Sequence, residues 1–195
     1  ASDVYKRQPY KHIYMQSLEG MRERTIVCNS LSKTYSITGW RLGYVIANPQ
    51  IIDRVKKVHD FLTVGAAAPL MEAAVVGLEF GDGYYDELAA HYAHMKEVFV
   101  GGLKKLGLKY TDPQGAYYVL VDVSEFGVKD DVKFCEWMAQ FVGVAAVPGS
   151  SFFREDVHNL VRFHFAKQDD TLNEAIKRLA TLKEKAMNAK NVDWR

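Results

Sequence analysis

The chain has 195 residues, of which 48% are hydrophobic, so it is long and apolar enough to bury a core and is not expected to be disordered. Its 25 basic and 24 acidic residues give a net charge of +1, which excludes the strongly basic surface typical of nucleic-acid-binding proteins. No apolar run is long enough to span a bilayer, and the N-terminus lacks the apolar stretch of a signal peptide. We therefore expect a cytoplasmic protein with no nucleic-acid and no membrane partner.

The first eight residues (ASDVYKRQ) look foreign to the rest of the chain. Residues 3–8 resemble one reading frame of a transposon-derived sequencing adaptor, and a segment of that kind is left out of fold reasoning. We expect residues 1–8 to be an adaptor-derived artefact, with natural coding that begins near Pro9 and continues upstream. The alternative is an ordinary polar tail.

Two apolar runs enclose a polar segment near the start of the chain. Thr25–Cys28 and Leu42–Ala47 each predict a buried strand. The segment between them contains Lys33, a hydroxyl three residues before it (Ser30) and an arginine eight residues after it (Arg41). We expect this segment to be a loop at the edge of a sheet, where functional residues are common.

Three helices are predicted next. Pro49 begins the first, whose apolar residues recur at a spacing of three and four and should pack against a neighbour. The second extends from about Pro69 to Phe80 and ends at a Gly-Asp-Gly sequence. The third carries an apolar stripe from Tyr85 to Leu106. Its roughly two dozen residues span about 36 Å at the standard helical rise, so we expect this helix to connect two domains.

Strands and helices alternate in the remainder. The predicted strands are Leu108–Thr111, Ala116–Asp122, Gly143–Val147 and Leu160–Ala166, and the predicted helices are 130–142 and a last one from near Thr171. In the final strand, Arg162 and His164 should face away from Val161, because side chains alternate along a strand. Glu174 would complete a capping box at the start of the last helix.

The cysteines and histidines do not suggest a metal site. Cys28 and Cys135 lie far apart and form no CxxC pair, which favours two reduced thiols over a disulfide or a zinc site. His91 and His94 are three residues apart on a predicted helix with no third ligand nearby in the sequence. We interpret them as surface histidines and predict no metal.

The polar segment around Lys33 has the chemistry of a phosphate and amine site. Ser30 offers a hydroxyl and Arg41 a fixed guanidinium, the groups that hold a phosphate dianion, and Gly39 would let the backbone approach closely. A lysine beside such a site suits an aldehyde cofactor with a phosphate tail, because nearby positive charge lowers the amine pKa and favours a Schiff base. The alternative is a plain surface lysine.

These residues also resemble a known family. Ser30–Gly43 (SLSKTYSITGWRLG) is similar at every restricted position to the lysine signature of class I and II pyridoxal-phosphate aminotransferases. The similarity continues, in the family's order and spacing, in Pro69–Ala74, Pro113–Tyr118, Val147–Phe152 and Leu160–Ala166. The resemblance implies an α/β fold of fold-type I. Residues 9–85 would then be a remnant of the cofactor-binding large domain, and residues 86–195 a linking helix and a small C-terminal domain.

The resemblance also implies roles for individual residues. Lys33 would form the aldimine with pyridoxal 5'-phosphate and move the substrate proton, Ser30 and Arg41 would bind the cofactor phosphate, and Arg162 would bind the substrate α-carboxylate. The implied reaction moves an amino group from an amino acid to a 2-oxo acid. Without the resemblance, Arg162 is more simply the exposed side of a half-buried strand, and Tyr117 and Tyr118 could be core or substrate contacts.

The chain departs from the family in length. Members are nearly twice as long, and their first half supplies a phosphate-capping loop, a ring-stacking aromatic residue, the aspartate that pairs with the pyridine nitrogen and a cofactor tyrosine. Tyr5 lies in the suspect segment and is not given the last role. We expect this chain alone neither to bind cofactor tightly nor to turn over substrate, and we expect a homodimer in the full-length protein.

Three other readings of the sequence remain open. Lyases and synthases of the same fold use the same lysine, and no residue here separates them from aminotransferases. An aminotransferase-like sensor domain of a transcription regulator would use the cofactor as a ligand. A serine acyltransferase would use Ser30 and Lys33 as an SxxK motif, but its SxN and KTG elements do not occur in the sequence.

Overall fold

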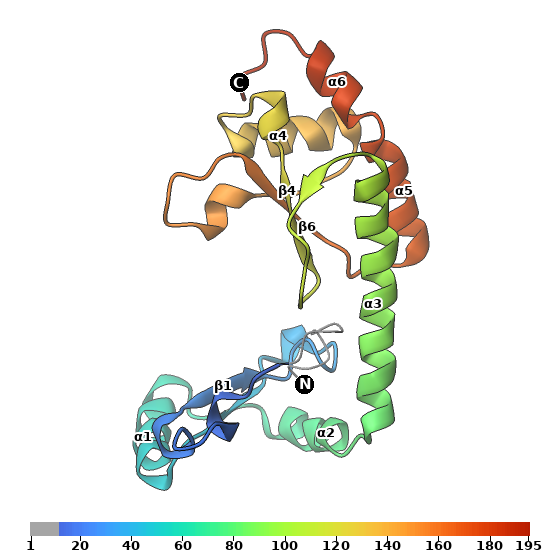
Figure 1. The fold of residues 1–195 in the computed structure, drawn as a ribbon. Helices are drawn as coiled ribbons and strands as arrows, with labels where there is room; N and C mark the ends of the chain where they lie inside the picture. The colour runs from blue at the N-terminus through green and yellow to red at the C-terminus, as the bar shows by residue number, and fades with distance from the viewer. Residues whose placement is uncertain (1–11) are drawn as a thin grey trace. The chain divides into compact units, whose positions relative to one another are not determined.

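A computed structural model describes residues 12–195 (Figure 1). Residues 1–8, which we interpret as adaptor-derived, lie outside the described part, as does Tyr5 within them. The described chain is an α/β protein that divides into two compact units, the first ending at Glu87 and the second beginning at Leu88. None of the helices in residues 12–195 combines the length and the hydropathy needed to cross a membrane.

The first unit contains one small sheet and the helices that follow it. Its elements are η2 (Met15–Ser17), η3 (Arg22–Arg24), β1 (Val27–Ser30), η4 (Thr38–Trp40), β2 (Gly43–Ile46), α1 (Pro49–Thr63) and α2 (Ala68–Leu78). The strands β1 and β2 pair antiparallel. The strand predicted at Thr25–Cys28 begins and ends two residues later, as β1. The strand predicted at Leu42–Ala47 is one residue shorter at each end, as β2. Their predicted burial is wrong, because β1 is alternately exposed and β2 is exposed throughout.

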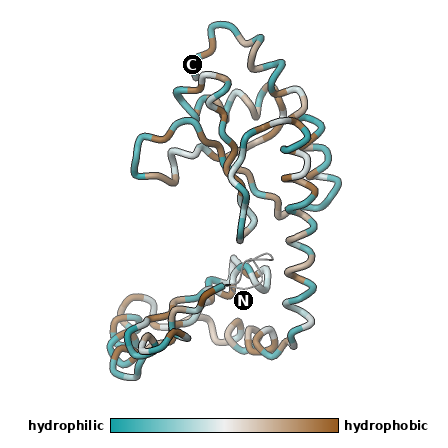
Figure 2. Tube along the Cα trace, viewed as in Figure 1, coloured by the Kyte–Doolittle hydropathy of each residue, from teal (hydrophilic) through white to brown (hydrophobic). Residues whose placement is uncertain are grey.

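Helix α1 confirms the predicted start at Pro49 but not the predicted packing. The Asn48 side chain caps the helix by accepting a hydrogen bond from the backbone N–H of Ile51 at 3.0 Å, and proline suits the first helical position because it lacks an N–H. No residue of α1 is buried, and Phe61 is 92% exposed. Figure 2 nevertheless shows hydrophobic residues along much of α1 and α2.

The second unit is built on helix α3 (Asp82–Lys105), which begins in the first unit, and on a four-stranded sheet. The sheet order is β3-β4-β6-β5, with every neighbouring pair antiparallel. Its strands are β3 (Lys109–Tyr110), β4 (Tyr118–Asp122), β5 (Val147–Pro148) and β6 (Leu160–His164). The remaining elements are η5 (Ser124–Phe126), α4 (Asp131–Trp137), η6 (Met138–Val142), η7 (Gly149–Phe152), α5 (Asp169–Leu179) and α6 (Leu182–Asn188).

One hydrophobic core holds the second unit together. Buried side chains from α3, from the inner faces of β4 and β6, and from α4 to α6 join in it, and the largest that are fully buried are Trp194, Phe99, Phe134 and Phe165. The predicted alternation along β6 is confirmed: Val161 and Phe163 are buried, Arg162 is half-buried and His164 is exposed.

Three expectations for the second unit need correction. The strand predicted at 143–147 pairs only at Val147–Pro148, and the residues before it line a cavity of about 710 Å³ with β6 and α5. The predicted helix 130–142 changes to a π-helical turn after Trp137. The predicted capping box is absent, since α5 already begins at Asp169, where two acidic residues favour the positive end of the helix. Glu174 pairs instead with Arg178, at 2.8 Å.

Candidate active site

The loop that carries the candidate lysine is closed at its base by strand pairing. Beyond the last β1–β2 pair, the backbone N–H of Leu31 donates to the carbonyl oxygen of Leu42 at 3.1 Å, and both side chains are buried. A Cβ atom at Gly43 would lie 2.6 Å from the backbone oxygen of Asn29, so the strands can meet here only at a glycine. We call Ser30 together with residues 31–42 the lysine loop.

Lys33 extends from the surface of the lysine loop. Its Nζ donates to Thr38 Oγ1 at 3.4 Å, and Thr38 Oγ1 donates to the carbonyl oxygen of Ser32 at 3.3 Å. Within residues 12–195, no carboxylate lies within ion-pairing distance of the amine. The amine is therefore held by one weak hydrogen bond to a neutral hydroxyl, and it remains accessible to an incoming electrophile.

Ser30 and Arg41 approach the same short turn from its two ends. Ser30 Oγ donates to Ser32 Oγ at 2.8 Å and accepts the backbone N–H of Ser32 at 3.1 Å. Arg41 has a left-handed backbone (φ 57°), and its Nη1 donates to the carbonyl oxygen of Thr38 at 2.9 Å. Lys33 and Arg41 thus both bind Thr38, and Thr38 in turn bonds to Ser32, the partner of Ser30. The structure therefore brings together the three residues that the sequence selected in this segment.

The donor set fits a phosphate-bearing aldehyde. Hydroxyl and guanidinium N–H groups hold a phosphate dianion, and Arg41 commits to Thr38 only one of its five N–H donors. A Cβ atom at Gly39 would meet nothing within 4 Å, so the loop has open space there rather than a packing need for glycine. Lys33 supplies the amine that an aldehyde requires.

Tyrosines from the helices support the lysine loop from behind. Tyr84 Oη donates to the carbonyl oxygen of the buried Thr34 at 2.6 Å. Tyr35 Oη lies 2.8 Å from Tyr85 Oη, and its ring packs so closely on α2 that a Cβ atom at Gly77 would come within 3.1 Å of it. Burial and the bond to Tyr85 raise the pKa of Tyr35, so it stays a neutral hydroxyl.

Arg162 is the candidate site residue of the second unit, and it is described with that unit alone. Its guanidinium carbon lies over the ring of Tyr118, 4.2 Å from the centroid, and over the ring of Phe152, at 3.7 Å. Among the described residues, no carboxylate lies within ion-pairing distance of it. A half-buried guanidinium held by aromatic rings and left without an internal anion is suited to bind an external carboxylate.

Two other side chains lie close to Arg162 along the chain or the sheet, His164 on β6 and Tyr117 before β4. Partial desolvation of the His164 ring, which is still in contact with solvent, lowers its pKa, and the neighbouring cations Lys167 and Arg162 lower it further, so this histidine favours the neutral form. Tyr117 stacks on Tyr92 of α3 with centroids 5.8 Å apart, whereas its neighbour in the sequence contacts Arg162. Tyr117 therefore packs against a helix, and Tyr118 contacts the arginine.

Several supporting residues were not found by reasoning from sequence. Thr38, Tyr84 and Phe152 act through contacts across the loop or between elements. Thr38, inside the lysine motif, and Phe152, at the end of the Val147–Phe152 segment, could have been noticed from their positions, whereas Tyr84 could not. No three metal-ligating side chains come together anywhere in the described chain. Cys28 is an exposed free thiol and Cys135 a buried one, and burial raises the pKa of Cys135 to about 12.

Comparison with known proteins identifies the family. Residues 4–179 match the family model described as aminotransferase class I and II. The methionine aminotransferase of Escherichia coli K12 is 37% identical over 163 residues, which are 83% of this chain and 42% of that protein. A probable N-succinyldiaminopimelate aminotransferase of Mycobacterium tuberculosis is 33% identical over 185 residues, 90% of this chain and 47% of that protein.

A solved structure agrees with these sequence matches. The structure of N-succinyldiaminopimelate aminotransferase from Mycobacterium tuberculosis superposes with a TM-score of 0.85 and 31% identity, over 93% of this chain and 48% of that one. The fold is thus that of the fold-type I aminotransferases, as expected. The chain spans about half the length of the curated relatives that it matches, and it belongs to the class I and II aminotransferases, a family whose members use pyridoxal phosphate.

Proposed function

We propose that this chain supplies the lysine and the carboxylate-binding arginine of a pyridoxal-phosphate-dependent aminotransferase, which moves an amino group from an amino acid to a 2-oxo acid. The observation that carries the proposal is the lysine loop, in which Lys33, Ser30 and Arg41 are tied to one turn through Ser32 and Thr38. The family to which the chain belongs supports the same activity.

Each residue has a distinct part in the proposed reaction. Ser30 and Arg41 hold the cofactor phosphate, and Arg162 fixes the substrate by its α-carboxylate. Lys33 Nζ is the covalent attachment point, and once displaced by substrate it takes the proton from the substrate Cα. When bound, the cofactor supplies the electron sink that makes this proton removable.

Borohydride trapping tests the attachment point. The full-length protein is incubated with pyridoxal phosphate, reduced with borohydride, digested and analysed by mass spectrometry. We expect one pyridoxyl-modified peptide, with the modification on Lys33, and none in a Lys33→Ala variant. Lys57→Ala removes an exposed lysine of α1 and should leave the modification unchanged. A modification on another lysine would refute the proposal.

The structure does not favour the serine acyltransferase reading. In that reading the lysine amine would have to activate the Ser30 hydroxyl, whereas Lys33 Nζ bonds to Thr38 and Ser30 Oγ bonds to Ser32. Lyases, synthases and ligand-sensing domains of the same fold differ in the fate of the product, so product analysis separates them from an aminotransferase. A keto acid together with a newly aminated acceptor is the expected result.

The domain roles, assembly and compartment are also proposals. We propose residues 9–85 as the remnant of the cofactor-binding domain and residues 86–195 as the linking helix and small domain, which is supported by the division of the structure after Glu87. A homodimer in the full-length protein agrees with the family, and two free thiols suit the cytoplasm. The related proteins are named for different substrates, so the amino acid itself is left open.

A further inference from the structure

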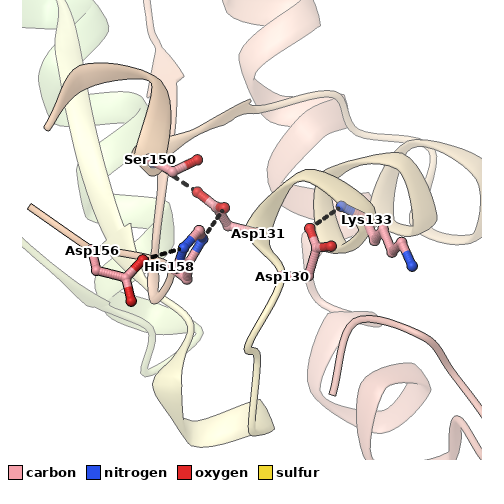
Figure 3. A network of polar contacts seen from close by, with 6 residues as sticks. All are labelled: Asp130, Asp131, Lys133, Ser150, Asp156 and His158. Carbon is pink, nitrogen blue, oxygen red and sulfur yellow. Dashed lines mark hydrogen bonds and ion pairs between the residues drawn. The ribbon is translucent and has the colours of Figure 1, made fainter. Parts of the chain in front are cut away.

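One buried carboxylate holds both ends of the segment that leads into β6. Asp131, at the start of α4, is fully buried. Its Oδ2 accepts the backbone N–H of Ser150 at 2.8 Å, and its Oδ1 accepts from His158 Nδ1 at 3.0 Å (Figure 3). Ser150 and His158 are the two ends of residues 150–158, which we call the clasped loop.

The imidazole of His158 is bonded to carboxylates through both ring nitrogens. Its Nε2 lies 2.8 Å from Asp156 Oδ1, on the side away from Asp131 (Figure 3). An ionised carboxylate can only accept a hydrogen bond, so both nitrogens must donate, and His158 is an imidazolium in this arrangement. The bonds to Asp131 and Asp156 accordingly raise the pKa of His158.

Asp131 stays ionised despite its burial. Burial alone would raise its pKa, but the hydrogen bonds from Ser150 and His158 outweigh that effect and hold the pKa below its usual value. Removing a carboxylate from water costs free energy, which its hydrogen bonds offset. If the carboxylate loses one of these partners, that cost is no longer offset. The two ends of the clasped loop are therefore coupled to each other through Asp131.

The clasped loop carries one of the two rings that hold Arg162. Tyr118 lies on β4 and is fixed by the sheet, whereas Phe152 lies inside the clasped loop, two residues beyond Ser150. The Phe152 ring is 3.7 Å from the Arg162 guanidinium carbon. Its position consequently depends on the bonds that Asp131 makes.

We propose that His158 is a positioning residue for Arg162: by tying the clasped loop to Asp131, it keeps Phe152 against the guanidinium. The inference rests on the proposed role of Arg162 as the binding site of the substrate carboxylate. In the described chain, the charged groups that act on the His158 ring are Asp131, from α4, and Asp156, from the loop itself. A neutral imidazole has one N–H and loses one of these two bonds, so the loop loosens as pH rises through the His158 pKa.

Tryptic cleavage after Arg154 measures the opening of the clasped loop in the purified full-length protein, without cofactor or substrate. Arg154 is exposed inside the loop. We expect His158→Ala to speed this cleavage about tenfold, the size of effect expected from a lost hydrogen bond to a charged group. His158→Asn keeps a donor where Nδ1 stood and should restore slow cleavage at neutral pH.

His94→Ala is the matched control. It removes a histidine of α3 that pairs with Asp169 of α5 at 2.8 Å, and neither residue belongs to the clasped loop. Cleavage after Arg154 should keep the wild-type rate in this variant. If His158→Ala also cleaves at the wild-type rate, the clasp does not hold the loop and the proposal fails.

Carboxylate binding links the clasp to Arg162. We would titrate the full-length protein with 3-phenylpropionate by isothermal titration calorimetry, and in the variants that retain Arg162 we would also follow its side-chain Nε–H by NMR. His158→Ala should weaken binding several-fold. Wild-type binding should be weaker at about pH 9 than at about pH 6, whereas binding by the His158→Asn variant should be the same at both. Faster cleavage with unchanged affinity would show that His158 does not position Arg162. Unchanged affinity in Arg162→Lys would instead overturn the proposed role of the arginine, while the cleavage result would still report on the clasp.

Discussion

The two units of the chain hold their candidate site residues in different ways. In the second unit, Arg162 lies on a strand whose inner face belongs to a core with Phe134 and Trp194 fully buried. In the described part of the first unit, the buried hydrophobic cluster consists of Leu31, Leu42 and Ala74. Arg162 is thus placed by a packed core, and Lys33 is placed by a short turn with its own hydrogen bonds.

Because of this difference, Arg162 and Lys33 should be displaced by different kinds of change. A residue on a packed sheet moves only when the core is disturbed, because interiors are close-packed. A loop held by a few hydrogen bonds can open locally without unfolding the rest. The predictions below test this contrast, beginning with the largest expected effect.

Removing a core ring should be far more costly than removing an exposed one. Phe134→Ala leaves a cavity beside Trp194 and should lower the free energy of unfolding of the second unit by about 3–5 kcal/mol. Phe61→Ala, on α1, should change the free energy of unfolding of the first unit by less than about 0.5 kcal/mol. Urea denaturation followed by tryptophan fluorescence measures both. Equal losses in the two variants would show that α1 is packed in solution and would remove the contrast between the units.

Two neighbouring glycines of α3 should respond in opposite directions. A Cβ atom at Gly102 would lie 2.5 Å from Ile176 of α5, so Gly102→Ala should destabilise the second unit by about 1–3 kcal/mol through overpacking. A Cβ atom at Gly101 meets nothing within 4 Å, and Gly101→Ala should stabilise the helix by up to about 1 kcal/mol. The midpoint of thermal unfolding should fall in Gly102→Ala and rise in Gly101→Ala. Midpoints that move together would mean that α3 and α5 adjust to the added methyl.

The support behind Lys33 should show a smaller and purely local effect. Tyr84→Phe removes the hydrogen bond to the Thr34 carbonyl oxygen and should cost about 1 kcal/mol. Hydrogen exchange of the lysine-loop amides should quicken, while exchange in the second unit stays unchanged. Tyr44→Phe removes an exposed bond to Asn29 and serves as the control. If exchange quickened in both units, the loop would not be an independent local element.

The sequence predicted best what depends on neighbours along the chain. The alternation of β6 followed from its period of two, and the extent of α3 followed from one apolar stripe and a glycine at its end. The lysine loop was found because three chemically distinct groups, Ser30, Lys33 and Arg41, lie within one short segment.

What the sequence could not predict depends on contacts between distant segments. Asp131 and His158 are 27 residues apart, and nothing in their spacing indicates that one will bind the other. The Phe152 contact with Arg162 likewise forms only when a loop folds back on the sheet. The strand expected at 143–147 was shortened because only Val147 and Pro148 find partners on β6, which local β-propensity does not encode.

The smallest expected effect concerns a surface pair of the second unit, and it tests whether such pairs matter beside the core. The hydrogen bond to Asp169 raises the pKa of the exposed His94 above its ordinary value of 6.5. Because the folded state binds this proton more tightly than the unfolded state, the pair stabilises the fold fully below pH 6.5 and stops doing so as pH rises through the folded pKa. His94→Asn should therefore melt slightly below wild type at about pH 5.5 and together with it at about pH 9. A deficit that persisted at the higher pH would show that His94 contributes by packing, and the second unit would then depend on its surface more than its core suggests.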